Sequence, residues 1–191
     1  MKAVGIFGGT FDPVHNGHLI TAQSILEKRN LEKIIFVPCN ISPHKINRVT
    51  AEAHHRLQMI KIAISNFPGF EYSDYEIKTG DVSYTLDTLM EFSKTYPKLE
   101  LIIGYDNLIK FDAWREPDKI LELAKLVVMK RNHDPNLKIF HKYFGEALYV
   151  DTPTIEISAS NIRKRIANGQ IIDALVPEKV KEYIYAFELY K

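Results

Sequence analysis

The stretch Val4-Gly5-Ile6-Phe7-Gly8-Gly9-Thr10-Phe11-Asp12-Pro13-Val14-His15-Asn16-Gly17-His18-Leu19 passes from an apolar run through a glycine turn into a helical pattern. The apolar run over 3–7 is typical of a short strand buried on both faces, and the paired glycines predict the turn that ends it. Apolar residues then recur at helical spacing from Leu19 to Leu26, which predicts a helix beginning near Gly17.

The start of this helix has the properties of an anion site. A helix N-terminus presents free N–H groups and a partial positive charge. His15 and His18, three positions apart, add two imidazoles to it. We therefore interpret residues 8–18 as a phosphate-binding segment.

The alternation of strand and helix continues along the chain. Apolar runs predict further strands over 33–37, 70–77, 99–103, 126–129 and 147–150. Helical spacing predicts helices after Thr50 and over 85–94, 108–111, 117–124, 160–167 and 177–187. This order predicts an α/β fold: a doubly wound, mostly parallel sheet of five to six strands with helices on both faces.

The predicted topology also places the site. In open sheets of this class, ligands bind beyond the carboxyl ends of the strands, where the strand order reverses. The loops expected on that edge are 8–18, 38–45, 104–114 and 157–163. These loops hold most of the unusual residues of the chain.

Length and composition narrow the class of protein. The 191 residues, 46% of them hydrophobic, are enough for one well-cored domain over 1–191. A net charge of +1 argues against nucleic-acid and membrane partners. The single cysteine, Cys39, excludes an internal disulfide framework and fits a reducing compartment. With neither a signal-peptide pattern nor a membrane-spanning apolar run, we expect a cytoplasmic protein, and its oligomeric state, including a homo-oligomer, stays open.

Two well-known phosphate-binding signatures are absent from the sequence. A dinucleotide fold requires Gly-x-Gly-x-x-Gly and an acidic residue about 20 positions later. The glycines over 5–17 and the strand end at 37–40 provide neither. A P-loop is excluded because no Gly-Lys-Ser or Gly-Lys-Thr follows the turn.

Zinc binding is an alternative role for His15 and His18, because zinc prefers nitrogen and sulfur ligands. The side chains that could complete a tetrahedron are Cys39, His44 and the pair His54 and His55. No paired-cysteine or His-Glu-x-x-His pattern accompanies them, and the nearby glycines favour an anion. A second alternative is that the two histidines serve only as turn and cap residues.

Residues 8–18 resemble the His-x-Gly-His signature of the nucleotidyltransferase superfamily. Four further segments, in the same order, resemble the bacterial nicotinate mononucleotide adenylyltransferases: 43–45, 83–89, 104–114 and 157–163. The resemblance implies a Rossmann-like nucleotidyltransferase fold. It also implies transfer of AMP from ATP to nicotinate mononucleotide, which forms nicotinate adenine dinucleotide and pyrophosphate in NAD biosynthesis.

The resemblance implies a catalytic set of His15, His18, Lys45 and Arg163. The imidazoles would donate to the α- and β-phosphates, Arg163 would hold the departing pyrophosphate, and Lys45 would bridge the reacting phosphates. Mg²⁺ carried by ATP is the implied cofactor, and no metal site of the protein itself is predicted. The attacking phosphate is already an anion, so alignment and charge stabilisation can supply the catalysis.

Two binding sites are expected beside this set. The ATP site is assigned to Gly8, Gly9, Thr10, Phe11, Gly104, Asp106, Ile157, Ser158 and Ser160. The mononucleotide site is assigned to Asn40, Tyr84, Thr85 and Trp114. The free amides at 83–85 suit a carboxylate, and Trp114 would stack on the pyridine ring. The alternatives are a helix cap for Asp106 and core packing for Trp114.

The late segment departs from the family pattern Ile-Ser-Ser-Thr-x-Ile-Arg at Ala159 and Ser160. Because Ala159 has no hydroxyl, only the backbone amide of this residue can donate to a phosphate. Three alternative functions stay open. They are a phosphopantetheine adenylyltransferase, whose chains are usually shorter and lack the segments around 83–85 and Trp114, a nucleotide-binding regulatory module without turnover, and a zinc-stabilised structural domain.

Overall fold

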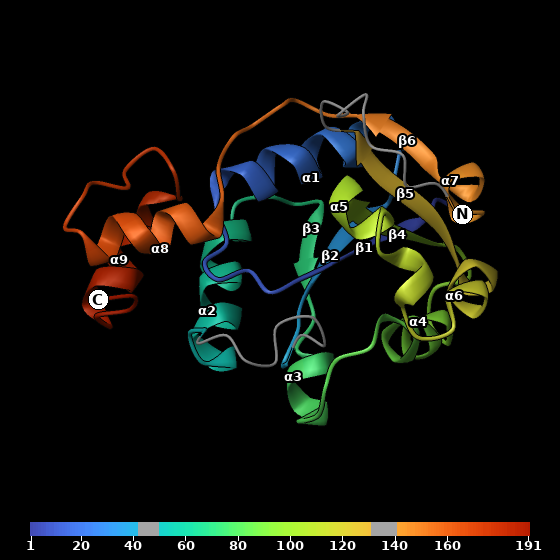
Figure 1. Cartoon of the computed structure of the whole chain (residues 1–191), viewed down its shortest axis with the longest axis horizontal. Helices are drawn as coiled ribbons and strands as arrows, with labels where there is room; N and C mark the ends of the chain where they lie inside the picture. Colours follow the sequence, from blue (N-terminus) through green and yellow to red (C-terminus); the bar gives the residue numbers. More distant parts are fainter. Residues whose placement is uncertain (42–49, 131–140) are drawn as a thin grey trace.

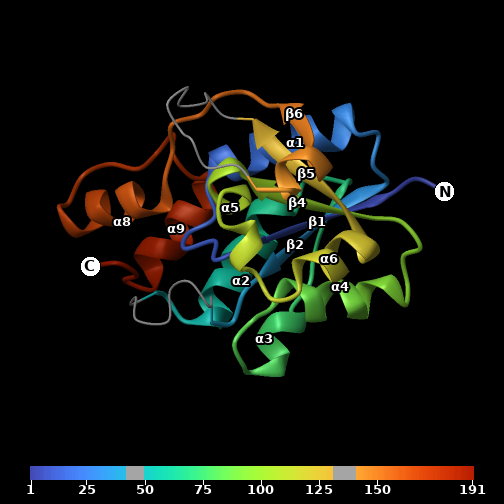
Figure 2. The ribbon, with the colours of Figure 1, turned by 45° about the vertical axis from the view of Figure 1, so that its right-hand side comes forward.

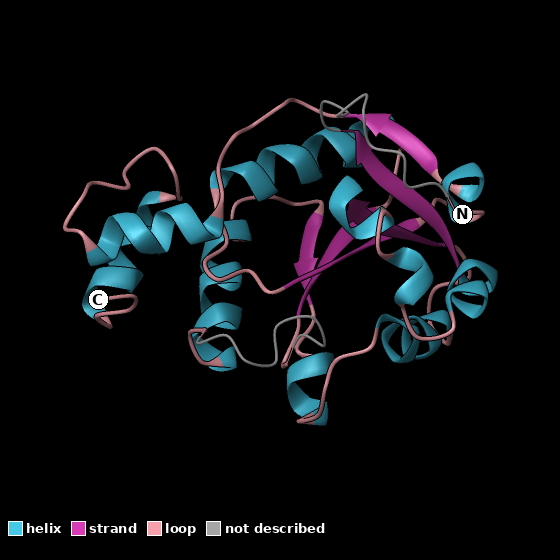
Figure 3. Ribbon diagram, in the orientation of Figure 1, coloured by secondary structure: helices cyan, strands magenta, loops and turns pink. Residues whose placement is uncertain are grey.

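A single parallel sheet organises the molecule, which is a computed structural model describing residues 1–41, 50–130 and 141–191. The described strands form one six-stranded sheet in the order β3-β2-β1-β4-β5-β6, with every neighbouring pair parallel. They are β1 (Val4–Gly9), β2 (Lys33–Pro38), β3 (Phe70–Tyr72), β4 (Leu99–Gly104), β5 (Ala124–Lys130) and β6 (Leu148–Asp151). Figure 3 shows them as a twisted central layer surrounded by helices.

Helices provide the crossovers that parallel strands require. They are α1 (Asn16–Lys28), α2 (Ala53–Ile64), α3 (Tyr75–Thr79), α4 (Thr85–Ser93), α5 (Tyr105–Leu108), the 3₁₀ turn η1 (Phe111–Ala113), α6 (Pro117–Leu123), α7 (Tyr143–Glu146), α8 (Ala159–Ala167) and α9 (Glu178–Ala186). Figures 1 and 2 both place α8 and α9 at the end of the molecule opposite the N-terminus. None of the helices described is long and apolar enough to cross a membrane.

The two faces of the sheet carry separate cores. On one face, Phe7, Phe36 and Ile102 pack together with α1, α2, α8 and α9. On the other face, Ile6 and Val37 belong to a cluster with α4, α5, α6 and α7. Because both faces are covered, the central strands are mostly apolar, as expected for a parallel sheet, and the buried Glu100 of β4 is paired with Arg29.

The strand order reverses beside β1. The chain moves from β1 through β2 to β3 on one side, and then crosses back to β4, β5 and β6 on the other. Phe7 of β1 is aligned with Phe36 of β2 and with Ile102 of β4. The carboxyl ends of these three strands therefore open on the same edge, where a ligand crevice is expected.

The structure corrects three details of the sequence prediction. The helix predicted over 108–111 is wrong, because α5 ends at Leu108 and the 3₁₀ turn η1 begins at Phe111. The strand predicted over 70–77 is wrong beyond Tyr72, because Tyr75–Thr79 forms α3 after Ser73 accepts a hydrogen bond from the N–H of Tyr75 at 3.2 Å. The two glycines expected to end the first strand instead continue it, since residues 8 and 9 of β1 pair with Val37 and Pro38.

Gly5 lies where the core leaves no room for a side chain. An added Cβ would lie 2.9 Å from both Ile102 Cδ1 and Leu31 Cδ1. We expect Gly5→Ala to lower the free energy of unfolding by about 1–3 kcal/mol, the usual effect of overpacking, measured by urea denaturation. Gly145→Ala is the control, because no heavy atom lies within 4 Å of its added Cβ. Equal stability of the two variants would contradict this account.

Candidate active site

Two cavities flank the carboxyl end of β1. The larger, about 390 Å³, lies between the end of β1, the start of α4 and the segment around η1. The smaller, about 30 Å³, lies between the start of α1 and residues 152–157. Both open at the edge of the sheet where the strand order reverses, and the larger one has the volume of a ligand pocket.

The smaller cavity is lined by the two histidines of the first loop. His15 is the N-cap of α1, and its ring stacks on that of His18 with centroids 3.6 Å apart. The main-chain N–H of His15 donates to Nδ1 of His18 at 3.2 Å. Since Nδ1 accepts, a neutral His18 carries its proton on Nε2. Gly17 leaves room for this pair, because a Cβ there would lie 3.0 Å from Nδ1 of His15.

Phe11 supports the histidines from behind. Its side chain is buried, with edge-to-face contacts to Phe7 at 5.5 Å and to His18 at 5.0 Å between centroids. Its φ of 50° turns the chain through the left-handed region two residues after Gly9. Phe11 was predicted to bind ATP, but its ring lies in the core and lines neither cavity described above.

The larger cavity brings together residues from several predicted segments. Its lining includes Gly8, Gly9 and Thr10 from the end of β1, Ser83, Tyr84 and Thr85 from the start of α4, and Trp114. Tyr84 is the N-cap of α4, so the first-turn amides of that helix lie at this wall. Trp114 also packs on Phe111, with centroids 5.1 Å apart, as the core-packing alternative expects. Its stacking on a pyridine ring stays a prediction.

Asn40 joins the loop after β2 to the start of α4. Its N–H donates to Ser83 Oγ at 2.9 Å, and its Nδ2 donates to the carbonyl of Asp81 at 3.3 Å. Its neighbour Cys39 lines the larger cavity, whereas Asn40 is not part of that lining. The contacts of Asn40 therefore fix the loop that borders the cavity.

Arg56 is a site-supporting residue that the sequence analysis missed. It is 1% exposed, and its guanidinium donates to the carbonyls of Thr10, Cys39, Asn40 and Ala51 at 2.7–3.0 Å. One buried cation thus ties together the loops after β1 and β2. The available signal was a charged residue within the apolar stripe of α2.

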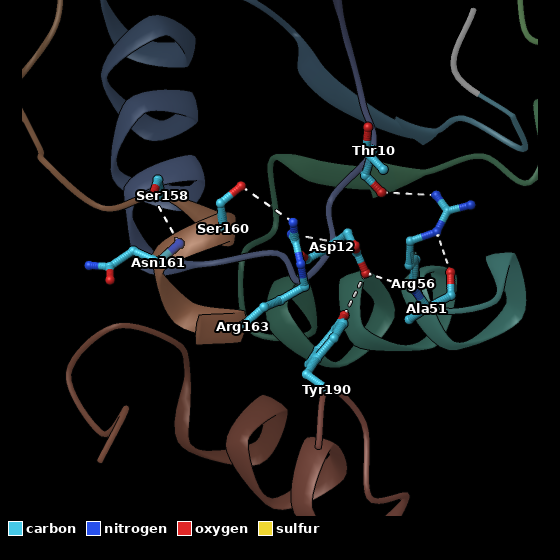
Figure 4. A network of polar contacts seen from close by, with 9 residues as sticks. All are labelled: Thr10, Asp12, Ala51, Arg56, Ser158, Ser160, Asn161, Arg163 and Tyr190. Carbon is cyan, nitrogen blue, oxygen red and sulfur yellow. Dashed lines mark hydrogen bonds and ion pairs between the residues drawn. The ribbon is translucent and has the colours of Figure 1, made fainter. Parts of the chain in front are cut away.

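The late loop meets the first loop through Arg163 (Figure 4). Arg163 Nη1 donates to the carbonyl of Asp12 at 2.6 Å, and Nη2 donates to Ser160 Oγ at 3.3 Å. Ser158 caps α8 by accepting a hydrogen bond from the N–H of Asn161 at 3.2 Å. Ile157 lines the smaller cavity. The two serines assigned to ATP thus also hold the helix start and its arginine in place.

The remaining predicted residues differ in their placement. Gly104 ends β4 beside Met129, which lines the smaller cavity. Asp106 is exposed on α5 and lines neither of these cavities, although the next residue, Asn107, lines the larger one. Lys45 lies outside the described residues.

The zinc alternative finds no support in the described ranges. Within 1–41, 50–130 and 141–191, no three His, Cys, Asp or Glu side chains are grouped so as to hold a metal ion. His44 lies outside those ranges. Nδ1 of His55 lies 2.8 Å from the hydroxyl of Tyr183, so this imidazole joins α2 to α9.

Comparison with known proteins identifies the family. A family model described as Cytidylyltransferase-like matches residues 6–165. The nicotinate-nucleotide adenylyltransferase of Bacillus subtilis is 38% identical over 193 residues, which cover 100% of each chain. A protein of Clostridium novyi named "Probable nicotinate-nucleotide adenylyltransferase" is 40% identical over 200 residues, also covering 100% of each chain. The chain belongs to the nicotinate-nucleotide adenylyltransferases.

Solved structures confirm the fold of this adenylyltransferase chain. A structure described as Plasmodium falciparum nicotinic acid mononucleotide adenylyltransferase complexed with NaAD matches with a TM-score of 0.81 at 23% identity, covering 100% of this chain and 98% of that one. The same protein complexed with APC matches with a TM-score of 0.78 at 22% identity and equal coverage. The prediction of an open parallel sheet with helices around it is therefore confirmed.

Two basic side chains of the larger cavity were not predicted. Lys110 and Arg115 both line it, on either side of Trp114. The guanidinium of Arg115 lies 5.0 Å from the ring centroid of Tyr84, and its Nη1 lies 3.1 Å from Asp87 Oδ2. In an adenylyltransferase, such cations suit the phosphate and carboxylate of a mononucleotide. Their positions next to the predicted stacking residue were the available signal.

Glu76 is a buried carboxyl at the wall of the larger cavity. It accepts a hydrogen bond from Thr88 Oγ1 at 2.6 Å. Thr88 rather than Met90 faces inward from α4, since Met90 is 52% exposed. Burial raises the pKa of Glu76 above its ordinary value, and the hydroxyls of Thr88 and Ser83 oppose that shift.

The raised pKa of Glu76 predicts a pH-dependent stability. Its stabilising contribution is fully present below the ordinary value of 4.5 and is lost as pH rises through the raised pKa. Glu76→Gln should therefore gain stability relative to the parent protein between about pH 4 and about pH 8, measured by urea denaturation. Glu182→Gln changes an exposed carboxylate of α9 and is the control, for which the difference in free energy of unfolding from the parent should not change with pH. A pH-independent difference for Glu76→Gln as well would contradict the raised pKa of Glu76.

Proposed function

We propose that this chain, acting as one nucleotidyltransferase domain, transfers AMP from ATP to nicotinate mononucleotide. The products are nicotinate adenine dinucleotide and pyrophosphate. The observation that carries the proposal is the full-length identity of about 40% to nicotinate-nucleotide adenylyltransferases. It is supported by two cavities at the carboxyl end of β1, one lined by Gly8 and Gly9 and the other by Phe7. The second cavity matters because the reaction joins two nucleotides, so each half requires a place of its own.

The ATP half is assigned to the side of the smaller cavity. There, Nε2–H of His18 and the N-terminus of α1 would donate to the phosphates. Arg163, with a side chain 28% exposed, would hold the pyrophosphate end. These groups act by stabilising charge on the phosphate oxygens as the bond between the α-phosphorus and its bridging oxygen breaks. Lys45 remains the proposed bridge between the reacting phosphates.

The mononucleotide half is assigned to the larger cavity. The first-turn amides of α4 at Tyr84 and Thr85 would bind the nicotinate carboxylate, and Trp114 would stack on the pyridine ring. Lys110 and Arg115 would add positive charge for the 5′-phosphate or the carboxylate. The bound phosphate then attacks the α-phosphorus without prior deprotonation, so positioning is the main task of this half.

Magnesium is proposed to enter with ATP. Mg²⁺ in nucleotide sites is held mainly by phosphate oxygens and water, with few protein ligands. The donors around the smaller cavity are imidazole and guanidinium groups, which suit phosphate rather than a hard cation. Bound on the triphosphate, the ion would neutralise part of its charge.

The activity is tested by incubating the protein with ATP, Mg²⁺ and either a panel of mononucleotides or phosphopantetheine while pyrophosphate release is followed. The proposal expects pyrophosphate with nicotinate mononucleotide and formation of the dinucleotide. Release with phosphopantetheine instead would place the chain among the phosphopantetheine adenylyltransferases. Nucleotide binding without pyrophosphate would favour a regulatory module.

His18→Ala should lower kcat by at least about 10²-fold, the usual effect of removing one positioned donor to a transition state. His54→Ala is the control, because that imidazole is 62% exposed on α2 and lines neither cavity of the site. Circular dichroism should give both variants the spectrum of the parent protein. Near-normal turnover by His18→Ala would refute its role.

The carboxylate site at α4 predicts preference for the acid over the amide. A helix N-terminus stabilises an anion but gains little from a neutral amide. We therefore expect a kcat/KM for nicotinate mononucleotide at least about tenfold above that for nicotinamide mononucleotide. Equal values for the two substrates would exclude this role for residues 83–85.

A further inference from the structure

The end of the chain returns to the first loop. After α9, the backbone passes through the left-handed region at Glu188 and Tyr190, with φ of 52° and 67°. Such conformations in residues other than glycine persist where surrounding contacts hold them. In Figure 4 the side chain of Tyr190 points from this tail toward Asp12.

Asp12 joins this tail to Arg163. The hydroxyl of Tyr190 donates to Asp12 Oδ1 at 2.8 Å, and the N–H of Ala51 donates to the same oxygen at 3.1 Å. On the other side, Asp12 Oδ2 lies 3.4 Å from Nη1 of Arg163. The same Nη1 donates to the main-chain carbonyl of Asp12 at 2.6 Å. One carboxylate thus has a hydroxyl on one oxygen and the guanidinium on the other.

This carboxylate is buried, with Asp12 only 3% exposed. A buried charge is stable only when fixed partners surround it, so its orientation is set by those partners. Burial and the neighbouring charge of Asp12 raise the pKa of Tyr190, which keeps its hydroxyl a donor. Without that hydroxyl, Oδ1 keeps one partner, and the carboxylate can rotate and move the guanidinium with it.

We propose that Tyr190 is a positioning residue of the ATP site, whose hydroxyl holds Asp12 so that Arg163 stays directed at the phosphates. The proposal rests on the proposed function in one respect, the role of Arg163 at the pyrophosphate end. It adds the C-terminal tail to the structures on which ATP binding depends. Tyr190, Asp12 and Arg163 are all absent from the linings of the two cavities, and the proposed effect reaches the phosphates through the partly exposed guanidinium of Arg163.

The test is a double-mutant cycle on the full chain. Tyr190→Phe removes only the hydroxyl, and Arg163→Ala removes the group through which it is proposed to act. The dissociation constant for ATP with Mg²⁺ is measured by titration calorimetry for the parent protein, both single variants and the double variant. Tyr183→Phe is the matched control. Like Tyr190, Tyr183 has a hydrogen-bonded hydroxyl, but its partner is His55 of α2 and not Asp12.

We expect Tyr190→Phe to weaken ATP binding roughly tenfold, and Tyr183→Phe to change it less than about twofold. In the Arg163→Ala background, the further change from Tyr190→Phe should fall to about twofold or less, because coupled residues are not additive. Unchanged binding in the single Tyr190→Phe variant would overturn the proposal. A full tenfold loss in both backgrounds would also overturn it, since Tyr190 would then act independently of Arg163.

Two further measurements keep the outcome interpretable. Thermal denaturation should place Tyr190→Phe within about 10 °C of the parent protein, so that the chain is folded during the titration. Should it unfold earlier, Asp12→Asn tests the link from Asp12 to Arg163 in the same cycle, because the amide oxygen still accepts from Tyr190 while the charge facing Arg163 is lost. ATP binding within about twofold of the parent protein would then overturn the proposal. A parent protein that binds ATP but releases no pyrophosphate would contradict the proposed function and leave the binding cycle to decide the role of Tyr190.

Discussion

Parallel pairing of β1 on both of its edges is the constraint on which the rest of the structure depends. With β2 on one side and β4 on the other, β1 is buried on both faces and can expose functional groups only where it ends. Its end coincides with the reversal of strand order, so the following loop has an open crevice on either side. Glycine at positions 8 and 9 then brings the main chain close to the larger cavity.

Buried charges stabilise the loops that this constraint creates. Arg56 donates to carbonyls of the loops after β1 and β2, and Asp12 binds both Arg163 and the C-terminal tail. Loops at a sheet edge have few strand partners for their polar groups, so these side chains satisfy them instead. In the proposed function, Arg163 of this network also holds the phosphates. Structural support and the proposed charge stabilisation would then come from neighbouring members of one network.

Much of the fold could be predicted from periodicity, because strands buried on both faces give apolar runs and covering helices give regular spacing. The exceptions have local causes. β3 spans only Phe70–Tyr72, too short for a pattern to mark its end, and the turn at Ser73 starts α3. Thr88 is polar but faces inward from α4, because it binds the buried Glu76. A hydrogen bond between two elements is not visible in the spacing of either one.

The lining of the two cavities was predictable where a motif carries it, since residues 8–18 and 83–85 both contribute to it. Its supporting groups were not. Tyr190 and Asp12 are separated by 178 positions, and Arg56 acts on carbonyls that every residue possesses. Such contacts follow from the tertiary fold and not from residue type. Membership of a motif also does not guarantee contact with a ligand, because Phe11 belongs to the motif over 8–18 but its ring packs in the core.

The placement of the two cavities on either side of β1 has a consequence for what remains bound after the reaction. In the proposed reaction each substrate occupies one cavity, whereas the dinucleotide spans the edge of the sheet and is held at both ends. A molecule bound at two linked places dissociates only when both release it, because the half still bound keeps the other at high local concentration. The product therefore leaves only when both cavities release it, whereas each substrate leaves when its own cavity releases it.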